Sequence, residues 1–175
     1  MNETVRDFVL PTLVLAVICL VVSAALSGTY GITNPIIEEN NRIAEQQALT
    51  EVLPAGDSFV AAEGSLPDGV SAFYTAENGA GCVVRVSPSG YGGPISMMVG
   101  LNTDGAISGI KVLENSETQG IGSKVMDESY TSQYAGKSGA DEVDAIGGAT
   151  ISSTGLKTGI RTAMEAAAAL GKGAN

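Results

Sequence analysis

Hydrophobic residues are concentrated in one run near the start of the chain and are spaced periodically in the remainder. No charged residue occurs from Phe8 to Ile37, and the stretch from Phe8 to Leu26 is almost entirely apolar. At about 1.5 Å per residue, a helix of this length spans about 28 Å, close to the hydrocarbon thickness of a bilayer. The pattern therefore predicts one transmembrane helix over residues 8–28.

A cleaved signal peptide is the alternative for this segment, because Ser23 to Gly28 offers small residues for a cleavage site. However, the apolar run is long for the central region of a signal peptide, and Arg6 is the one basic side chain before it. We therefore favour a retained membrane helix. Because no Lys or Arg follows until Arg42, we expect residues 1–7 to be cytoplasmic and the large domain to lie on the outer side of the cell membrane.

The segment after the membrane run predicts a second helix that joins it to the domain. Ser27 to Gly31 interrupts the apolar pattern, and Asn34 followed by Pro35 is typical of a helix start. Apolar residues then recur at helical spacing up to the next proline. We expect a connecting helix over residues 29–54 and a globular domain over residues 55–175.

The domain shows the alternating pattern of β-strands. Strands are predicted at Val70–Thr75, Cys82–Ser87, Ile95–Leu101 and Ala106–Leu113. Asn102 to Gly105 joins the last two of these as a hairpin, because an Asp-Gly pair favours the tight turn that hairpins use. A loop rich in glycine and proline, Ser87 to Pro94, separates the second and third strands.

The segments after the strands are more mixed. Glu114 to Gly122 is a polar loop that either approaches a ligand or serves as an ordinary connection. We expect a short helix over Asp127–Tyr134, entry into a strand over Asp141–Ile146 and a helix over Thr154–Leu170. The predicted fold class is α+β, an antiparallel sheet with flanking helices preceded by one transmembrane helix.

Charge and cysteine content narrow the possible partners. Lys plus Arg total 9 and Asp plus Glu total 19, so the net charge is −10. This balance argues against nucleic acid and against an anionic membrane surface, and it suits a domain held beside other proteins. Cys19 would lie in the membrane and Cys82 in a strand of the domain, so we expect no conventional disulfide.

One run near the C-terminus, Asp144 to Ser153 (DAIGGATISS), suggests a particular chemistry. Glycines lead to hydroxyls just before the last predicted helix, for which Ser152, Ser153 or Thr154 would be the N-cap. The amides and dipole of a helix start favour an anion such as phosphate. The chain has no histidine and no cysteine nearby, so we expect neither a metal site nor a Ser-His-Asp triad. A purely structural glycine turn would use the same residues.

The run resembles the flavinylation motif of the FMN-binding domain family, in which an acidic residue precedes a Ser/Thr-Gly-Ala-Thr core. The resemblance implies that Thr150 carries FMN through a phosphoester bond and that Asp144 is recognised by a dedicated flavin transferase. Gly147 stands where the family usually has Ser or Thr, which removes one hydroxyl near the phosphate. The other implied cofactor-binding residues of this run are Gly148, Ala149, Ile151, Ser152 and Ser153.

A second motif supports the resemblance. Ser116 to Gly122 (SETQGIG) is similar to the SETPGLG loop that lies beside the flavin in that family, and Gly90 to Ile95 (GYGGPI) also looks like the family. The resemblance covers roughly residues 70–170. The flavin neighbours that it implies in this loop are Glu117, Thr118, Gly120 and Ile121.

Within this family, a chain of this length with one N-terminal helix most resembles the G subunit of the Rnf complex. That complex couples electron transfer between ferredoxin and NAD to ion movement across the membrane. The resemblance implies an electron-transfer subunit of a redox-driven translocase, with covalent FMN and no catalytic activity alone. Its partners would be the other membrane subunits and the flavin transferase.

Three other interpretations stay open. A membrane-anchored domain that binds a phosphorylated ligand non-covalently would use the same loop. A flavin-domain protein of another respiratory or extracellular electron-transfer system would share the chemistry and differ in its partners. A pilin-like structural protein also has an N-terminal apolar helix, but the segment around Phe8 lacks the Glu and the preceding Gly processing site of pilins.

Overall fold

A single long helix forms the N-terminal part of the chain. The computed structural model describes residues 10–62 and 64–170, so the expected cytoplasmic segment 1–7 lies outside the described residues. Helix α1 runs from Leu10 to Val52 and has Pro35 in its interior. The predicted break at Ser27 to Gly31 and the new helix start at Asn34 are therefore wrong. One missing hydrogen bond at proline does not end a helix whose long flanks both propagate it.

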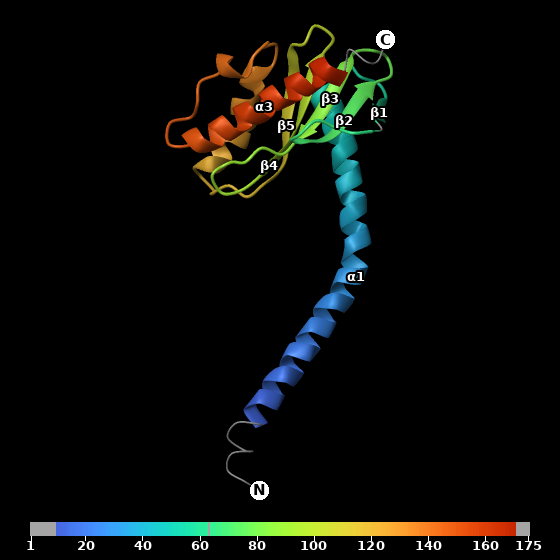
Figure 1. The fold of residues 1–175 in the computed structure, drawn as a ribbon, viewed down its shortest axis with the longest axis vertical. Coiled ribbons are helices and arrows are strands. Elements are labelled where there is room, and N and C mark those ends of the chain that lie inside the picture. The colour runs from blue at the N-terminus through green and yellow to red at the C-terminus, as the bar shows by residue number, and fades with distance from the viewer. Residues whose placement is uncertain (1–9, 63, 171–175) are drawn as a thin grey trace. The chain divides into compact units, whose positions relative to one another are not determined.

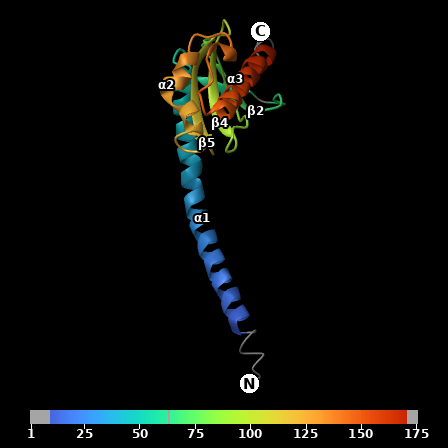
Figure 2. The ribbon, with the colours of Figure 1, turned by 90° about the vertical axis from the view of Figure 1, so that its left-hand side faces the viewer.

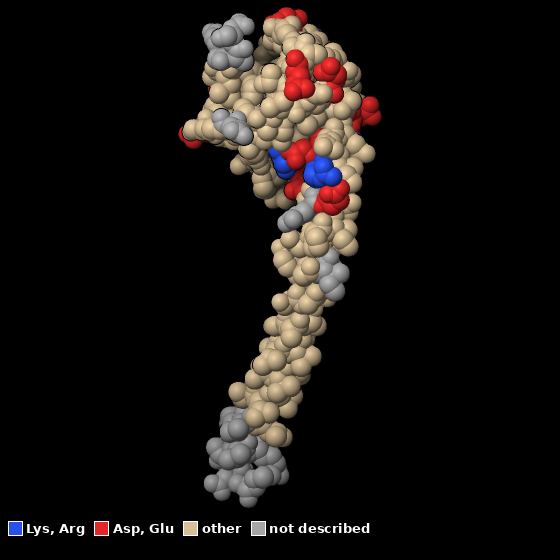
Figure 3. Space-filling view, turned by 90° about the vertical axis from the view of Figure 1, so that its right-hand side faces the viewer, with Lys and Arg blue, Asp and Glu red and all other residues tan. Residues whose placement is uncertain are grey.

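The apolar stretch of α1 is exposed along its length. Its most apolar 18-residue window has a mean hydropathy of 2.5 and is 0% buried. Figure 3 shows this stretch in tan, with red and blue side chains appearing only toward its C-terminal end. The helix is thus long and apolar enough to cross a membrane. Contacts divide the chain into two compact units, Met1–Ala44 and Glu45–Asn175, so the last turns of α1 belong to the globular unit.

The globular unit is built on one antiparallel sheet in which neighbouring strands follow the chain order (Figure 1). The strands are β1 (Phe59–Ala61), β2 (Val70–Ala76), β3 (Gly81–Val86), β4 (Ile95–Asn102) and β5 (Ile107–Asn115). The four predicted strands and the hairpin between β4 and β5 are confirmed. Strand β1 was not predicted, since it is a short and largely exposed edge strand without an apolar alternation.

Both faces of the sheet are covered. Helix α3 (Thr150–Leu170) packs on one face, where Leu156 and Ile160 belong to the same buried core cluster as Val99 of β4. In Figure 2, α3 lies across the strands. On the other face the end of α1 places Val52 over Gly100 of β4 and its neighbour Gly109 of β5. A side chain on Gly100 would collide with the Val52 backbone, so these glycines allow the helix end to lie close to the sheet.

Polar contacts also hold the end of α1 on the sheet. The Glu45 carboxylate accepts a hydrogen bond from the Tyr74 hydroxyl and pairs with Arg85 at 3.4 Å. Burial, followed by the bond to Glu45, raises the pKa of Tyr74 to about 12. Tyr74 therefore stays a hydrogen-bond donor to Glu45 at physiological pH. Cys82 lies in β3 as predicted, and burial raises the pKa of its thiol to about 11.

The segment between β5 and α3 forms short turns of helix. These are η2 (Gly122–Met126), α2 (Glu128–Thr131), η3 (Ser132–Tyr134) and η4 (Ala140–Glu142). The expected short helix over Asp127–Tyr134 is confirmed as α2 with η3. The expected strand at Asp141–Ile146 is wrong, because its polar groups bond to side chains and turns. Glu142 accepts from the Ser138 amide, and Asp141 pairs with Arg161 of α3.

Candidate functional site

Two loops and the start of α3 surround a cleft of about 610 Å³. One wall comes from the loop after β5 together with Tyr91 of the loop before β4, and the other from the turn that leads into α3. The lining residues are Tyr91, Glu117, Thr118, Ile121, Gly122, Gly148, Ala149, Thr150, Ile151 and Ser152. The sequence motifs Ser116–Gly122 and Asp144–Ser153 therefore meet at one place.

The turn before α3 is held by a backbone hydrogen bond and by a hydrogen bond to a serine hydroxyl. Gly148 has a φ of +83°, which only glycine adopts readily. The Ala149 amide donates to the Ile146 carbonyl at 3.0 Å, and the Ser153 hydroxyl accepts from the Ile146 amide at 3.1 Å. Helix α3 consequently begins at Thr150, so the expected start at Thr154, with Ser152, Ser153 or Thr154 as the N-cap, is wrong. The two serines are buried in the first turn, where Ser152 bonds to Glu117 of the other loop and Ser153 bonds to Ile146 of the turn itself.

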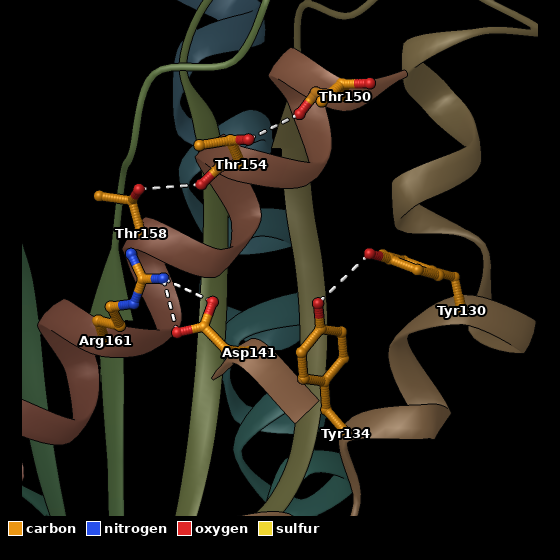
Figure 4. A network of polar contacts seen from close by, with 7 residues as sticks. All are labelled: Tyr130, Tyr134, Asp141, Thr150, Thr154, Thr158 and Arg161. Carbon is orange, nitrogen blue, oxygen red and sulfur yellow. Dashed lines mark hydrogen bonds and ion pairs between the residues drawn. The ribbon is translucent and has the colours of Figure 1, made fainter. Parts of the chain in front are cut away.

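A tyrosine supports the turn at its other end. The Tyr130 hydroxyl donates to the Asp144 carbonyl at 2.9 Å. It also contacts the Tyr134 hydroxyl, and the two rings meet edge to face with centroids 5.8 Å apart (Figure 4). Burial, with the Tyr130 contact second, raises the pKa of Tyr134. The carboxylate of Asp144 remains exposed at the surface of this supported turn.

The hydroxyls at the start of α3 differ in availability. Ser152 and Ser153 are 2% and 0% exposed, and both hydroxyls are hydrogen-bonded. The Thr154 hydroxyl donates to the Thr150 carbonyl at 2.8 Å (Figure 4). The Thr150 side chain is exposed, and among the described residues its hydroxyl has no hydrogen-bond partner. Thr150 therefore offers the accessible and unengaged hydroxyl of this turn.

The position of Thr150 also suits an anion. As the first residue of α3, it lies where the backbone N–H groups of the first turn have no acceptor within the helix. The helix dipole adds a favourable field for negative charge at this end. A phosphate joined to the Thr150 hydroxyl would lie in this field.

The opposite wall is organised around a buried carboxylate. Glu117 is 8% exposed and accepts hydrogen bonds from the Tyr91 amide at 2.7 Å and the Ser152 hydroxyl at 3.0 Å. A longer contact of 3.3 Å comes from the Gly92 amide. The Glu117 amide in turn donates to the Asn115 side chain at 3.1 Å. One side chain thus joins three segments of the cleft.

The structure explains why glycine occupies several positions around this carboxylate. Gly120 has a φ of +81°, which a turn with an L side chain would adopt only with strain. A side chain on Gly122 would collide with one oxygen of Glu117, and a side chain on Gly90 would collide with the other. The two glycines therefore leave room for the carboxylate between them.

Apolar side chains stand at the cleft. Tyr91, Ile121 and Ile151 line it and are 70%, 55% and 58% exposed. In the described part of the globular unit, the other strongly exposed large apolar side chain is Val60, at 53%. Exposed apolar groups gathered at a cleft with a few placed polar groups are typical of a cofactor site.

The structure brings most of the predicted site residues together. Those that line the cleft are Thr150, Gly148, Ala149, Ile151, Ser152, Glu117, Thr118 and Ile121. Three predicted residues do not line it: Ser153 supports the turn, Gly120 shapes the loop, and Asp144 is exposed at the entry to the turn. Two lining residues, Tyr91 and Gly122, were not predicted as site residues, although both occur in the motifs that carry the resemblance.

The residues present fit FMN. Apolar side chains at the cleft suit a flat aromatic ring, while the start of α3 suits its phosphate. The fold and this cleft define an FMN-binding domain that follows a helix long enough to span a membrane.

Comparison with known proteins agrees with this class. Residues 90–165 match the FMN-binding domain family, and residues 8–52 match the RnfG N-terminal region. The chain belongs to the family of Rnf-complex G subunits.

Its relatives include components of ion-translocating complexes. The G subunit of the Na⁺-translocating ferredoxin:NAD⁺ oxidoreductase complex of Acetobacterium woodii is 30% identical over 87% of this chain and 88% of its own length. The G subunit of the proton-translocating ferredoxin:NAD⁺ oxidoreductase complex of Clostridium ljungdahlii is 24% identical over 86% of each chain. The G subunit of the ion-translocating oxidoreductase complex of Methanosarcina acetivorans is 29% identical over 86% of this chain and 89% of its own length. These relatives support an electron-transfer role in an ion-translocating complex.

Proposed function

We propose that this chain is a membrane-anchored flavoprotein subunit that relays electrons through FMN attached covalently to Thr150. The observation that carries the proposal is the exposed and unengaged hydroxyl of Thr150, at a helix start that lines an apolar cleft. Neighbouring hydroxyls are buried or bonded, which favours Thr150 as the single acceptor. The relatives named above support an Rnf-type ion-translocating complex as the proposed setting of this relay.

Each residue of the site has a part in this proposal. Thr150 forms the phosphoester, with net loss of water between its hydroxyl and the FMN phosphate. Asp144, exposed on the supported turn, is recognised by the flavin transferase. Bound FMN supplies one- and two-electron chemistry, whereas the protein supplies binding and orientation. No general base is needed for such a relay, so the subunit acts as part of a redox-driven translocase and not as a catalyst alone.

The N-terminal helix suggests how the subunit is oriented in the membrane. Residues 1–7 are proposed to be cytoplasmic, the apolar part of α1 spans the cell membrane, and the FMN domain lies on the outer side. The other membrane subunits of the complex are the proposed redox partners. A covalent bond suits this arrangement, since a relay exposed to an aqueous compartment would otherwise lose its cofactor by dissociation.

The test replaces Thr150 with valine, which keeps the shape of the side chain and removes the hydroxyl. The full chain is expressed with a flavin transferase, and covalent flavin is measured by fluorescence in a denaturing gel and by intact mass. We expect the unaltered chain to gain the mass of FMN minus water and Thr150→Val to gain nothing, with folding unchanged. Thr154→Val is the matched control, since it removes an exposed hydroxyl one turn later and should keep its flavin.

Two outcomes would contradict the proposal. A fluorescent band in Thr150→Val would move the attachment to another hydroxyl, with Ser152 and Ser153 the next to test. Flavin that leaves the unaltered chain on denaturation would instead support the non-covalent alternative, in which the same helix start binds the phosphate of a free ligand.

A further inference from the structure

We propose that Glu117 is a positioning residue that sets the shape of the flavin cleft by holding the Tyr91 wall against the start of α3. The ligand in this inference rests on the proposed function. The geometry does not, because it concerns contacts within the protein. Glu117 lies just after β5, and its carboxylate meets the loop before β4 and the first turn of α3.

The two carboxylate oxygens accept hydrogen bonds from different residues. Oε1 accepts from the Tyr91 amide at 2.7 Å, while Oε2 accepts from the Ser152 hydroxyl at 3.0 Å and more weakly from the Gly92 amide at 3.3 Å. Every one of these partners donates to the carboxylate, so a side chain with two acceptor oxygens is required here.

Burial makes these bonds necessary. Glu117 is 8% exposed, and within residues 10–62 and 64–170 it forms no ion pair with a Lys or Arg. A carboxylate removed from water without a cation is stable only where hydrogen-bond donors replace its hydration. Gly90 and Gly122 are flush against its two oxygens, so the surrounding chain is shaped to accommodate this group.

We call Glu117 and its hydrogen bonds to Tyr91, Gly92 and Ser152 the clamp. The clamp affects the cleft because two of the residues that it joins, Tyr91 and Ser152, line the cleft. The Tyr91 side chain is 70% exposed and lines the cleft, so little of its ring is fixed by packing within the protein. Its backbone amide is bonded to Glu117, and this bond restrains the backbone from which the ring projects. Since Ser152 also lines the cleft, Glu117 sets the distance between the two walls. An aromatic ring bound between the two walls would be immobilised only while the Glu117 hydrogen bonds are intact.

Thr150 and Asp144 do not contact this clamp through any hydrogen bond that the structure describes. The inference therefore separates attachment from immobilisation. Loss of the clamp should leave covalent attachment intact and should free the attached ring to move.

The test compares Glu117→Gln with Glu114→Gln in the full chain in detergent. The first change keeps the shape of the side chain but turns one acceptor into an amide that donates. Glu114 is exposed at the end of β5 and serves as the control, because it loses the same charge without losing a hydrogen bond that the structure describes. Glu117→Asp keeps the charge but is too short to reach both walls, so it decides the question if Glu117→Gln does not fold.

The first readout is amide hydrogen exchange in flavin-free protein. We expect peptides that contain Tyr91 and Gly92 to exchange about five- to tenfold faster in Glu117→Gln, the size of one lost hydrogen bond, and to be unchanged in Glu114→Gln. The second is the fluorescence anisotropy of the flavin in loaded protein, which should fall in Glu117→Gln while the covalent band in a denaturing gel keeps its intensity.

The outcomes separate this inference from the proposed function. Unchanged exchange at Tyr91 and Gly92, or unchanged anisotropy of an attached flavin, would overturn the role of Glu117. A missing covalent band in the unaltered chain would overturn the proposed function instead, and the exchange measurement, made without flavin, would still decide whether Glu117 positions the cleft wall.

Discussion

The two loops that form the cleft both contain an acidic residue, glycines and hydroxyl side chains, but they orient these side chains differently. Ser116–Gly122 directs its charged side chain inward, where Glu117 is buried and bonded to neighbouring segments. Asp144–Ser153 directs its reactive groups outward, since the side chains of Asp144 and Thr150 are both exposed. The first loop joins segments of the cleft, and the second leaves exposed the side chains that the proposed attachment and recognition would use.

The glycines of the two loops differ in the same way. Gly122 is buried and has no room for a side chain, because the Glu117 carboxylate lies against it. Gly147 and Gly148 are exposed, and a side chain on either would meet no atom within 4 Å. Substitutions in the inward loop should therefore act through packing, and those in the outward loop through recognition or backbone conformation.

The largest expected effect is on recognition, at Asp144. Asp144→Ala should slow covalent flavin attachment by about tenfold or more, since a lost hydrogen bond to a charged group is worth about 1.5–3 kcal/mol. Its stability should change by less than about 0.5 kcal/mol, as for other exposed positions. Asp68→Ala removes the same charge from another exposed position and serves as the control.

Attachment is followed by gel fluorescence over time, and stability by thermal unfolding of the same samples. If Asp144→Ala acquires flavin at the rate of Asp68→Ala, the outward loop is not recognised through this carboxylate.

The next effect is on packing, at Gly122 of the inward loop. Gly122→Ala forces a methyl group against Glu117 and should destabilise the globular unit by about 1–3 kcal/mol, as overpacking does. Gly139→Ala is the matched control, because its added methyl group would meet only the Glu142 carboxylate at 3.7 Å. Thermal unfolding measures both variants. Equal melting temperatures would show that the inward loop accommodates the methyl group with no loss of stability.

The sequence predicted what depends on neighbouring residues. In β3 and β4 apolar side chains recur at every second position, and an Asp-Gly pair marks the hairpin to β5, so these elements were predicted correctly. The local pattern of Phe59–Ala61 is too short and exposed to identify β1. The run from Gly28 to Pro35 carries local signals for a break, yet the helix continues because long helical segments on both sides propagate it.

The site was predicted through its motifs, but the roles of individual residues were not. Glu117 bonds to partners 26 and 35 residues away along the chain, and no local pattern reveals such contacts. Ser152 and Ser153 looked like caps of a later helix, because a serine near a helix start is usually a cap. In the folded chain the Ser152 hydroxyl bonds to Glu117 and the Ser153 hydroxyl to the Ile146 amide, and α3 begins before both serines.

A smaller effect is expected at Gly148 of the outward loop. Its φ of +83° lies in the left-handed region, so Gly148→Ala should cost about 1–2 kcal/mol from backbone strain alone. Nothing lies within 4 Å of the added methyl group, so packing contributes nothing to the loss. Chemical denaturation of the flavin-free chain measures the change, and full stability in Gly148→Ala would mean that the turn relaxes to another conformation.

The smallest effect, of opposite sign, is expected at the adjacent Gly147. Its φ lies outside the left-handed region and its surroundings are open, so Gly147→Ala should stabilise the chain by about 0.4–1 kcal/mol by restricting the unfolded state. The same open space means that Gly147→Ser, which supplies the hydroxyl usual in the family, should fold normally and attach flavin at least as fast as the unaltered chain. Denaturation and gel fluorescence measure the two changes. A loss of stability in Gly147→Ala would contradict this expectation. It would show that Gly147, like Gly148, does not tolerate a side chain despite its open surroundings.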